Sequence, residues 1–219
     1  MGRMVQRLVL ASQSPRRKEL LEILGVPFSI VVPATDETPR LGESPEDYVV
    51  RVARDKAREV AFRVKESTVV AADTVVTIDL EILGKPHDRA DAVRMLSRLS
   101  GRDHEVFTAV CVINQLNGVV REGLEKTSVS FRKLSRQEIE DYLERENVLD
   151  KAGAYAIQGF ASVFIPRISG SYSNVMGLPL ALVYIAVVKP VIKPLVSLES
   201  ARSTCKNLLS RSFIASRSR

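Results

Sequence analysis

The chain has 219 residues with a net charge of +6, and 45% of its residues are hydrophobic while 26% are charged. This balance is close to the globular average and provides enough aliphatic side chains for a core, which excludes a disordered chain. Residues 201–219 hold five basic residues and no acid, so the remaining chain is nearly neutral and a nucleic-acid-binding face on it is not indicated.

The cysteines and the apolar stretches indicate a cytoplasmic protein. Cys111 and Cys205 lack the spacing of a zinc site or a disulfide framework, which fits a reducing compartment. Residues 1–10 lack the apolar core of a signal peptide. The longest apolar stretch, 178–188, is too short to span a bilayer. We therefore expect no membrane contact.

The first part of the chain predicts strands alternating with helices. Ser14-Pro15 and Ser44-Pro45 each combine an N-cap residue with a proline suited to the first helical position. Between the second helix and residue 79 the chain is nearly continuously β-branched, which is typical of a strand buried on both faces. The predicted strands are 7–11, 28–32 and 68–78, and the two helices end near residues 24 and 64.

The second part predicts a long hairpin and further helices. Asn117-Gly118 is a turn signal between two strand-like runs, and Ser135 with Glu138 matches a capping box. The predicted strands are 104–114, 119–131, 154–158 and 162–165, and the predicted helices are 88–99, 135–144 and 176–187. This order indicates an α/β fold with a mixed sheet over residues 1–188. Residues 189–219 are rich in serine and predict a poorly ordered basic tail.

The start of the first helix is a candidate phosphate site. A helix N-terminus offers free backbone N–H groups and a partial positive charge. Ser12 and Ser14 add hydroxyls, and Arg16, Arg17 and Lys18 add cations where only a bound anion would favour them. An ordinary capped helix with solvated basic residues is the alternative, and the local pattern does not decide between them.

Asp73 is the second candidate, because it lies inside the apolar run Ala71-Ala72-Asp73-Thr74-Val75-Val76. A buried carboxylate is costly unless it is paired or bound to a metal, so Asp73 is a candidate metal ligand or general base. The alternative is an aspartate that caps a turn at the strand end. The apolar neighbours favour the functional interpretation.

Three further charged residues are weaker candidates. Glu37, in Asp36-Glu37-Thr38, could complete a Mg²⁺ site, although for this motif taken alone a turn with surface acids is the better explanation. Lys85, in Leu83-Gly84-Lys85-Pro86, could reach a phosphate, and Lys56 lies on a helix face with other basic residues. Solvated lysines are the simpler alternative for both. The sequence contains no Walker loop and no Gly-x-Gly-x-x-Gly motif.

These pieces together resemble the Maf-like nucleotide pyrophosphatases, also called septum-formation-inhibitor-like proteins. The resemblance covers about residues 7–185. The matching stretches are Leu10 to Arg17, Ala72 to Val76, Gly84-Lys85-Pro86, Gly101 to Val110, Lys151 to Gly159, Gly170-Ser171-Tyr172 and Gly177 to Leu180. Two features depart from the family pattern: Ala71 stands where a glycine is usual, and the chain continues into the basic tail.

The resemblance implies an elongated α/β fold of two lobes with a central cleft. It also implies hydrolysis of a nucleoside triphosphate to the monophosphate and pyrophosphate with Mg²⁺, or with Mn²⁺, and it allows a homodimer. The resemblance implies that Asp73 is the general base and that Glu37 lies at the metal site. Whether Asp73 acts as the base or as a second metal ligand stays open. The implied substrate-binding residues are Ser12, Ser14, Arg16, Arg17, Lys56, Thr74, Lys85 and Gln158.

The segment Ala154 to Gly159 is similar to that of the subgroup that acts on dTTP and UTP. The Gln158 amide can both donate to and accept from a pyrimidine edge. Two alternatives stay open: a pyrophosphatase for another modified or non-canonical nucleotide, and a non-catalytic regulator that binds nucleic acid through the basic tail.

Overall fold

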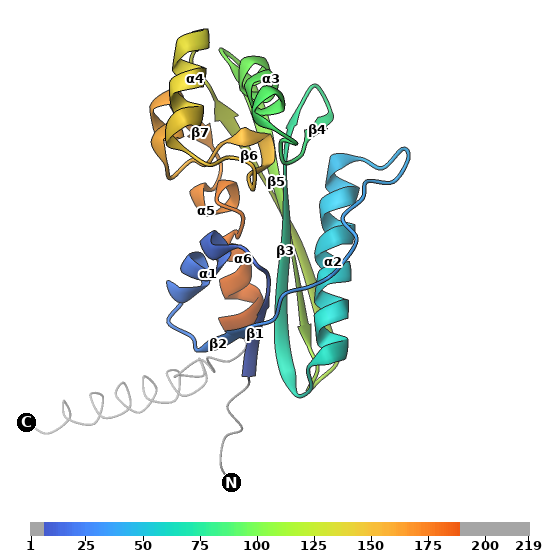
Figure 1. Ribbon diagram of the computed structural model, residues 1–219. Helices are drawn as coiled ribbons and strands as arrows, with labels where there is room; N and C mark the ends of the chain where they lie inside the picture. The colour runs from blue at the N-terminus through green and yellow to red at the C-terminus, as the bar shows by residue number, and fades with distance from the viewer. Residues whose placement is uncertain (1–6, 189–219) are drawn as a thin grey trace, which may run out of the picture.

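The computed structural model describes residues 7–188, which form one open, mixed sheet with helices on both faces (Figure 1). The strand order is β2-β1-β3-β5-β6-β7, and β4 pairs with the end of β3. The strands are β1 (Arg7–Ala11), β2 (Phe28–Ile30), β3 (Ser67–Ile78), β4 (Glu81–Leu83), β5 (Asp103–Asn114), β6 (Val119–Ser130) and β7 (Arg167–Ser169). The helices are α1 (Pro15–Glu22), α2 (Pro45–Arg63), α3 (Arg89–Leu99), α4 (Arg136–Arg145), α5 (Tyr172–Val175) and α6 (Leu180–Val183). Short 3-10 turns cover Ala152–Ala154 and Phe160–Phe164, and a π-helical turn covers Tyr184–Val188.

Two lobes share the long strands of the sheet. β1 runs parallel to β2 and to β3, whereas β3, β5, β6 and β7 pair antiparallel. In Figure 1 the helices α1, α2 and α6 surround the lower part of β3, and α3 and α4 lie at its upper end. We call these parts the lower lobe and the upper lobe. This arrangement confirms the α/β fold with a mixed sheet and two lobes that the sequence predicted.

The alternation of side chains along β3 sorts its residues between the two faces of the lower lobe. Val69, Ala71 and Val75 belong to the core formed with α2, whereas Val70 and Ala72 belong to the core formed with α1 and the C-terminal helical segment. Asp73 has the parity of the first set and Thr74 that of the second. Although Asp73 and Thr74 are adjacent in sequence, their side chains therefore project from opposite faces of the sheet.

Four predicted helix starts are confirmed by their caps. The side chains of Ser14, Ser44, Asp88 and Ser135 each accept a hydrogen bond from the backbone N–H three residues later. Ser135 and Glu138 form the complete reciprocal capping box. Short-range signals of this kind are reliable because both partners lie within one helical turn.

Several predicted elements in the last third of the chain are wrong. The predicted strand 154–158 is replaced by turns, because Gly153 and Ala154 adopt positive φ angles of 68° and 61°, which interrupt an extended chain. The predicted strand 162–165 lies largely within the 3-10 turn Phe160–Phe164. The predicted helix 176–187 begins only at α6, after Gly177 with φ 106°. The strands β4 and β7 were not predicted, and each has only three residues. Such short strands depend on the neighbour they pair with.

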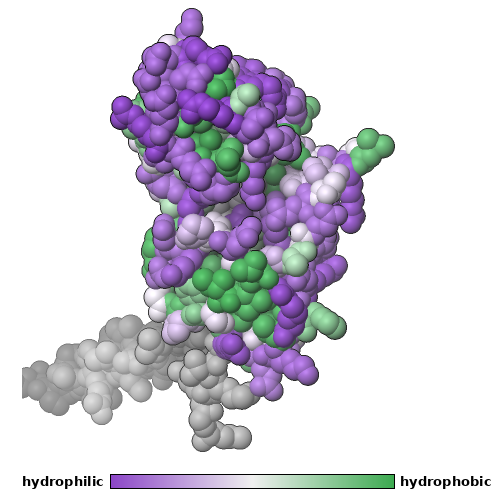
Figure 2. Space-filling view, viewed as in Figure 1, coloured by the Kyte–Doolittle hydropathy of each residue, from purple (hydrophilic) through white to green (hydrophobic). Residues whose placement is uncertain are grey.

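Within residues 7–188, no helix has the length and apolar character needed to cross a membrane. Figure 2 shows that the upper lobe is mostly hydrophilic on the visible face, whereas the lower lobe carries a hydrophobic area. The predicted basic tail, residues 189–219, lies outside the described residues, so its prediction is untested.

Candidate active site

A cleft of about 480 Å³ lies between the two lobes. Its lower wall comes from the end of β1, the start of α1, the loop before α2, α2 itself and the middle of β3. Its upper wall comes from the segment after β4 and the segment between α4 and Phe160. All ten residues predicted for the site line this cleft: Ser12, Ser14, Arg16, Arg17, Glu37, Lys56, Asp73, Thr74, Lys85 and Gln158. The tertiary structure thus brings together residues that are up to 146 positions apart in the chain.

The turn from β1 into α1 presents the helix N-terminus to the cleft. Ser14 caps α1 by accepting from Arg17 N at 3.4 Å, and Ser12 Oγ accepts from Ser14 N at 3.1 Å. Ser12 is 4% exposed, so its hydroxyl serves the loop that shapes the helix start. This geometry can bind an anion through backbone N–H groups.

The three cations of the first helical turn separate in the structure. Arg16 and Arg17 line the cleft. Lys18, which the phosphate-site hypothesis included, is exposed and pairs with Glu22 at 3.7 Å on the helix surface. That part of the hypothesis is therefore wrong. The reason is the 100° step of the helix, which turns residue 18 away from the face that residue 17 occupies.

Arg17 is anchored by two hydrogen bonds that join distant segments. Its Nε donates to Gly177 O at 2.8 Å and its Nη2 donates to Thr74 Oγ1 at 3.1 Å. The Thr74 hydroxyl also shares a 2.9 Å hydrogen bond with Thr108 on β5. Burial lowers the pKa of Arg17, while the nearby carboxylates of Asp73 and Glu37 raise it. The guanidinium stays charged and is held in one orientation inside the cleft.

Asp73, Lys56 and Glu37 form the charged centre of the lower wall. Lys56 Nζ lies 2.8 Å from Asp73 Oδ1 and 2.6 Å from Glu37 Oε1. The Lys56 and Asp73 side chains are 6% and 8% exposed, and that of Glu37 is 42% exposed. Asp73 lies inside β3 opposite Ala109 on β5, so the alternative of an aspartate capping the strand end is excluded.

The surroundings shift the pKa values of the two carboxyl groups in opposite directions. Burial raises the pKa of Asp73, and the charges of Lys56 and Arg17 oppose that shift. Partial burial also acts to raise the pKa of Glu37, but the hydrogen bond and charge of Lys56 outweigh it and lower this pKa. A buried carboxylate with a raised pKa is suited to accept a proton.

The donor set of this centre fits a hard divalent cation. Glu37 and Asp73 present carboxylate oxygens that converge on the single ammonium of Lys56. Mg²⁺ is commonly held by one or two carboxylates together with substrate phosphates. Among residues 7–188, no three His, Cys, Asp or Glu side chains form a cluster able to hold a metal alone. The two carboxylates are compatible with the few protein ligands that Mg²⁺ commonly uses.

The upper wall differs in character. Lys85 and Gln158 line the cleft with exposed side chains. Tyr155 lines it as a buried residue, and its hydroxyl forms a 2.8 Å hydrogen bond with His104 Nε2. Burial lowers the pKa of His104 to about 4, so the ring is neutral at pH 7.

No role was predicted from the sequence for Asp150, at the mouth of the cleft, or for Tyr155, in its wall. Asp150 Oδ2 lies 3.4 Å from Arg16 Nη1 and links the two lobes. Tyr155 lay within the stretch that carried the resemblance, but no role was assigned to it. The pair of Arg16 and Asp150 is separated by 134 positions, so no local sequence pattern could reveal it. For Tyr155, an aromatic residue beside a predicted substrate residue was the available signal.

The fold and the cleft define an α/β protein whose site combines a helix N-terminus, a fixed guanidinium and a carboxylate–lysine–carboxylate centre. A family model described as "Maf-like protein" matches residues 7–189. The chain belongs to the Maf family, which confirms the resemblance found in the sequence.

Curated relatives match most of the chain. A protein of Anaeromyxobacter dehalogenans strain 2CP-1 is 52% identical over 180 residues, which cover 81% of this chain and 91% of the relative. One from Symbiobacterium thermophilum is 49% identical over 176 residues, covering 80% and 90%. One from Bacillus cytotoxicus is 46% identical over 177 residues, covering 81% and 92%. Each of the three is named "dTTP/UTP pyrophosphatase".

Proposed function

We propose that this protein hydrolyses nucleoside triphosphates, with dTTP and UTP favoured, to the nucleoside monophosphate and pyrophosphate. The observation that supports this most is the convergence of Arg17, Lys56, Asp73 and Glu37 on one cleft beside the N-terminus of α1. The names of relatives that are 46–52% identical support the same substrates.

In this proposal the lower wall binds the triphosphate. The N-terminal amides of α1, Arg17 and the half-buried Arg16 contact phosphate oxygens, and Arg17 keeps its orientation through Gly177 and Thr74. Arg16 leaves Asp150 when a phosphate competes for its guanidinium, because that exposed pair at 3.4 Å is weak.

The bond that breaks joins the bridging oxygen to the α-phosphorus. A water oxygen attacks the α-phosphorus, its proton passes to the Asp73 carboxylate, and pyrophosphate leaves with the bonding electron pair. Lys56 and Lys85 neutralise the charge that develops on the pyrophosphate. The raised pKa of Asp73 brings its basicity closer to that needed to receive the proton at neutral pH.

We propose Mg²⁺ as the cofactor, with Mn²⁺ as a substitute of similar ligand preference. Glu37 and Asp73 would hold the ion, which when bound neutralises charge on the phosphate oxygens. Lys56 keeps both carboxylates near each other while no ion is bound. The two carboxylates therefore do not need to move apart before the substrate arrives.

The upper wall selects the base. The exposed Gln158 amide can donate to and accept from the edge of a pyrimidine. Tyr155 and Val106 add apolar surface to the same wall. A single amide gives modest selectivity, so the proposal includes dTTP and UTP together.

The test is pyrophosphate release by the full-length protein with Mg²⁺ from dTTP, UTP, CTP, 7-methyl-GTP and ITP. We expect release to be fastest from dTTP and UTP. A preference for another nucleotide would keep the pyrophosphatase and contradict the role of Gln158. No release from any of them by folded protein would contradict the proposed activity and favour a regulator that binds nucleotides or nucleic acid.

We also propose a cytoplasmic location and, as an arrangement that the family resemblance allows, a homodimer. The support for the first is a free and buried cysteine, Cys111, which is compatible with a reducing compartment. Cell fractionation tests the location, and sedimentation of the purified full-length chain tests the dimer. A membrane-associated pool or a monomer at micromolar concentration would contradict them.

A further inference from the structure

The segment that carries Glu37 has no secondary structure of its own. It runs from the end of β2 at Ile30 to the start of α2 at Pro45. Loops of this length inside a compact domain are commonly functional. Without a backbone ladder, side-chain contacts must determine where the Glu37 carboxylate lies. The side-chain hydrogen bonds that reach this loop from outside it come from α2.

Two side chains of α2 donate hydrogen bonds to the backbone carbonyls of Glu37 and Thr38. The Tyr48 hydroxyl donates to Glu37 O at 2.8 Å, and Arg51 Nη2 donates to Thr38 O at 3.1 Å. Tyr48 is 8% exposed. The Arg51 guanidinium lies 5.5 Å from the centre of the Tyr48 ring, so the two donors also support each other.

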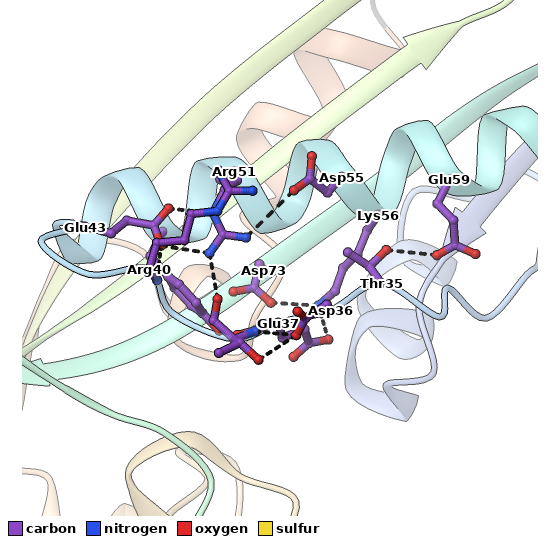
Figure 3. A network of polar contacts seen from close by, with 12 residues as sticks. Thr35, Asp36, Glu37, Arg40, Glu43, Arg51, Asp55, Lys56, Glu59 and Asp73 are labelled. Atoms are coloured by element: carbon purple, nitrogen blue, oxygen red, sulfur yellow. Dashed lines mark hydrogen bonds and ion pairs between the residues drawn. The ribbon is translucent and has the colours of Figure 1, made fainter.

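Arg51 is itself fixed by a bidentate ion pair. Its Nε and Nη2 lie 2.6 and 2.8 Å from the two oxygens of Glu43, and both side chains are close to 12% exposed (Figure 3). Glu43 Oε2 also accepts from Arg40 N at 3.1 Å. The Arg51 guanidinium therefore links Thr38, Glu43 and, through Glu43, Arg40. These links restrict the motion of the loop more than a single hydrogen bond would.

The opposite end of the loop is bound to the same helix. Glu59 accepts from Ala34 N at 2.7 Å and from Thr35 Oγ1 at 2.9 Å. Positions 48, 51, 56 and 59 follow the spacing of one side of a helix. The adjoining face of α2 packs its apolar residues against β3, so α2 sets the position of Glu37 relative to Asp73.

We propose that Tyr48 and Arg51 are positioning residues that hold Glu37 beside Asp73 and thereby determine the affinity of the site for its divalent ion. This inference rests on the proposed function, because it assigns the metal site to Glu37 and Asp73. Neither residue is among those that line the cleft. Both act through the backbone carbonyls of Glu37 and Thr38.

The test uses full-length Tyr48→Phe and Arg51→Gln variants. The first removes one hydroxyl and keeps the ring, so it preserves the packing. Loss of one hydrogen bond predicts a roughly fivefold weaker affinity for Mn²⁺, and loss of the Arg51 contacts predicts an effect on the order of tenfold. Mn²⁺ binding is measured by electron paramagnetic resonance in the presence of a dTTP analogue with a non-hydrolysable α–β bridge. The Mg²⁺ concentration for half-maximal pyrophosphate release is the second readout.

Arg54→Gln is the matched control. Arg54 lies on the same helix and forms the same bidentate pair, with 2.6 and 2.8 Å contacts to Glu122, but it does not touch the loop. Its variant should show wild-type Mn²⁺ affinity and measures the general cost of losing such a pair. In a Glu37→Gln background, Tyr48→Phe should add little further loss, because its effect passes through Glu37.

The outcomes separate the two proposals. If the wild-type protein hydrolyses dTTP and both variants keep its Mn²⁺ affinity, the positioning role is wrong and the proposed function stands. An equal loss in Arg54→Gln, or a full additional loss in the Glu37→Gln background, would also contradict the role. If the wild-type protein neither binds Mn²⁺ with the analogue nor releases pyrophosphate, the proposed function and this inference both fail.

Discussion

The two walls of the cleft differ in how far their polar side chains are buried. On the lower wall Ser12, Lys56 and Asp73 are each 4–5% exposed and are already hydrogen-bonded to neighbours. On the upper wall the polar residues Lys85 and Gln158 are exposed. Preorganised buried charges favour one transition state, whereas exposed groups on an apolar wall favour adaptable recognition. We infer that the lower wall performs most of the chemistry, whereas on the upper wall Gln158 chooses the base and Lys85 neutralises the leaving group.

Asp73→Asn is the largest expected disruption of the lower wall. An amide cannot accept the proton of the attacking water, so kcat should fall about 10²- to 10⁴-fold. Glu37 remains beside Lys56 at 2.6 Å, so the fold should persist by circular dichroism. Asp141→Asn on the surface of α4 is the control. A folded Asp73→Asn variant with near-normal turnover would contradict the role of Asp73.

The pH dependence of the free energy of unfolding tests the burial of His104 behind the upper wall. Its folded-state pKa is lowered to about 4 by burial, against about 6.5 in an unfolded chain. Between these values the unfolded state binds the extra proton, so stability is complete above pH 6.5 and falls by about 3 kcal/mol towards pH 4. Denaturant unfolding of the wild type and of His104→Gln across this range measures the difference. We expect a flatter profile for the variant, and parallel profiles would contradict the prediction.

Arg17→Lys tests the part of the lower wall that is proposed to bind phosphate. A lysine cannot donate to Gly177 O and Thr74 Oγ1 while also facing a phosphate. Loss of charged hydrogen bonds predicts a roughly 10- to 100-fold lower kcat/KM for dTTP. Lys18→Arg, one residue further on the exposed face, should change it less than about twofold. Equal effects at both positions would mean that Arg17 has no special role.

Gln158→Glu is the smallest expected effect and concerns selectivity alone. A carboxylate accepts hydrogen bonds but no longer donates, so it should disfavour UTP and favour the amino group of CTP. We expect the ratio of kcat/KM for UTP over CTP to fall roughly tenfold, the value of one hydrogen bond of about 1.4 kcal/mol. An unchanged ratio would remove Gln158 from base selection.

The sequence by itself determined the parts that depend on neighbours within one turn of helix or one strand. The caps at Ser14, Ser44, Asp88 and Ser135 and the buried run around Asp73 were all recognisable, because their signals are short-range. The resemblance then supplied the ten site residues, and the structure brings them to one cleft.

Only the tertiary structure decided the features that rely on distant partners. The strands β4 and β7 exist because β3 and β6 offer free edges, while the expected strands 154–158 and 162–165 are replaced by turns at Gly153 and Ala154 and by the 3-10 turn Phe160–Phe164. The anchoring of Arg17 by Gly177 and of the Glu37 loop by Tyr48 and Arg51 joins segments without a shared local pattern. A hydrogen bond between such segments forms only after the sheet has brought them within about 3 Å of each other, and sequence periodicity contains no information about that distance.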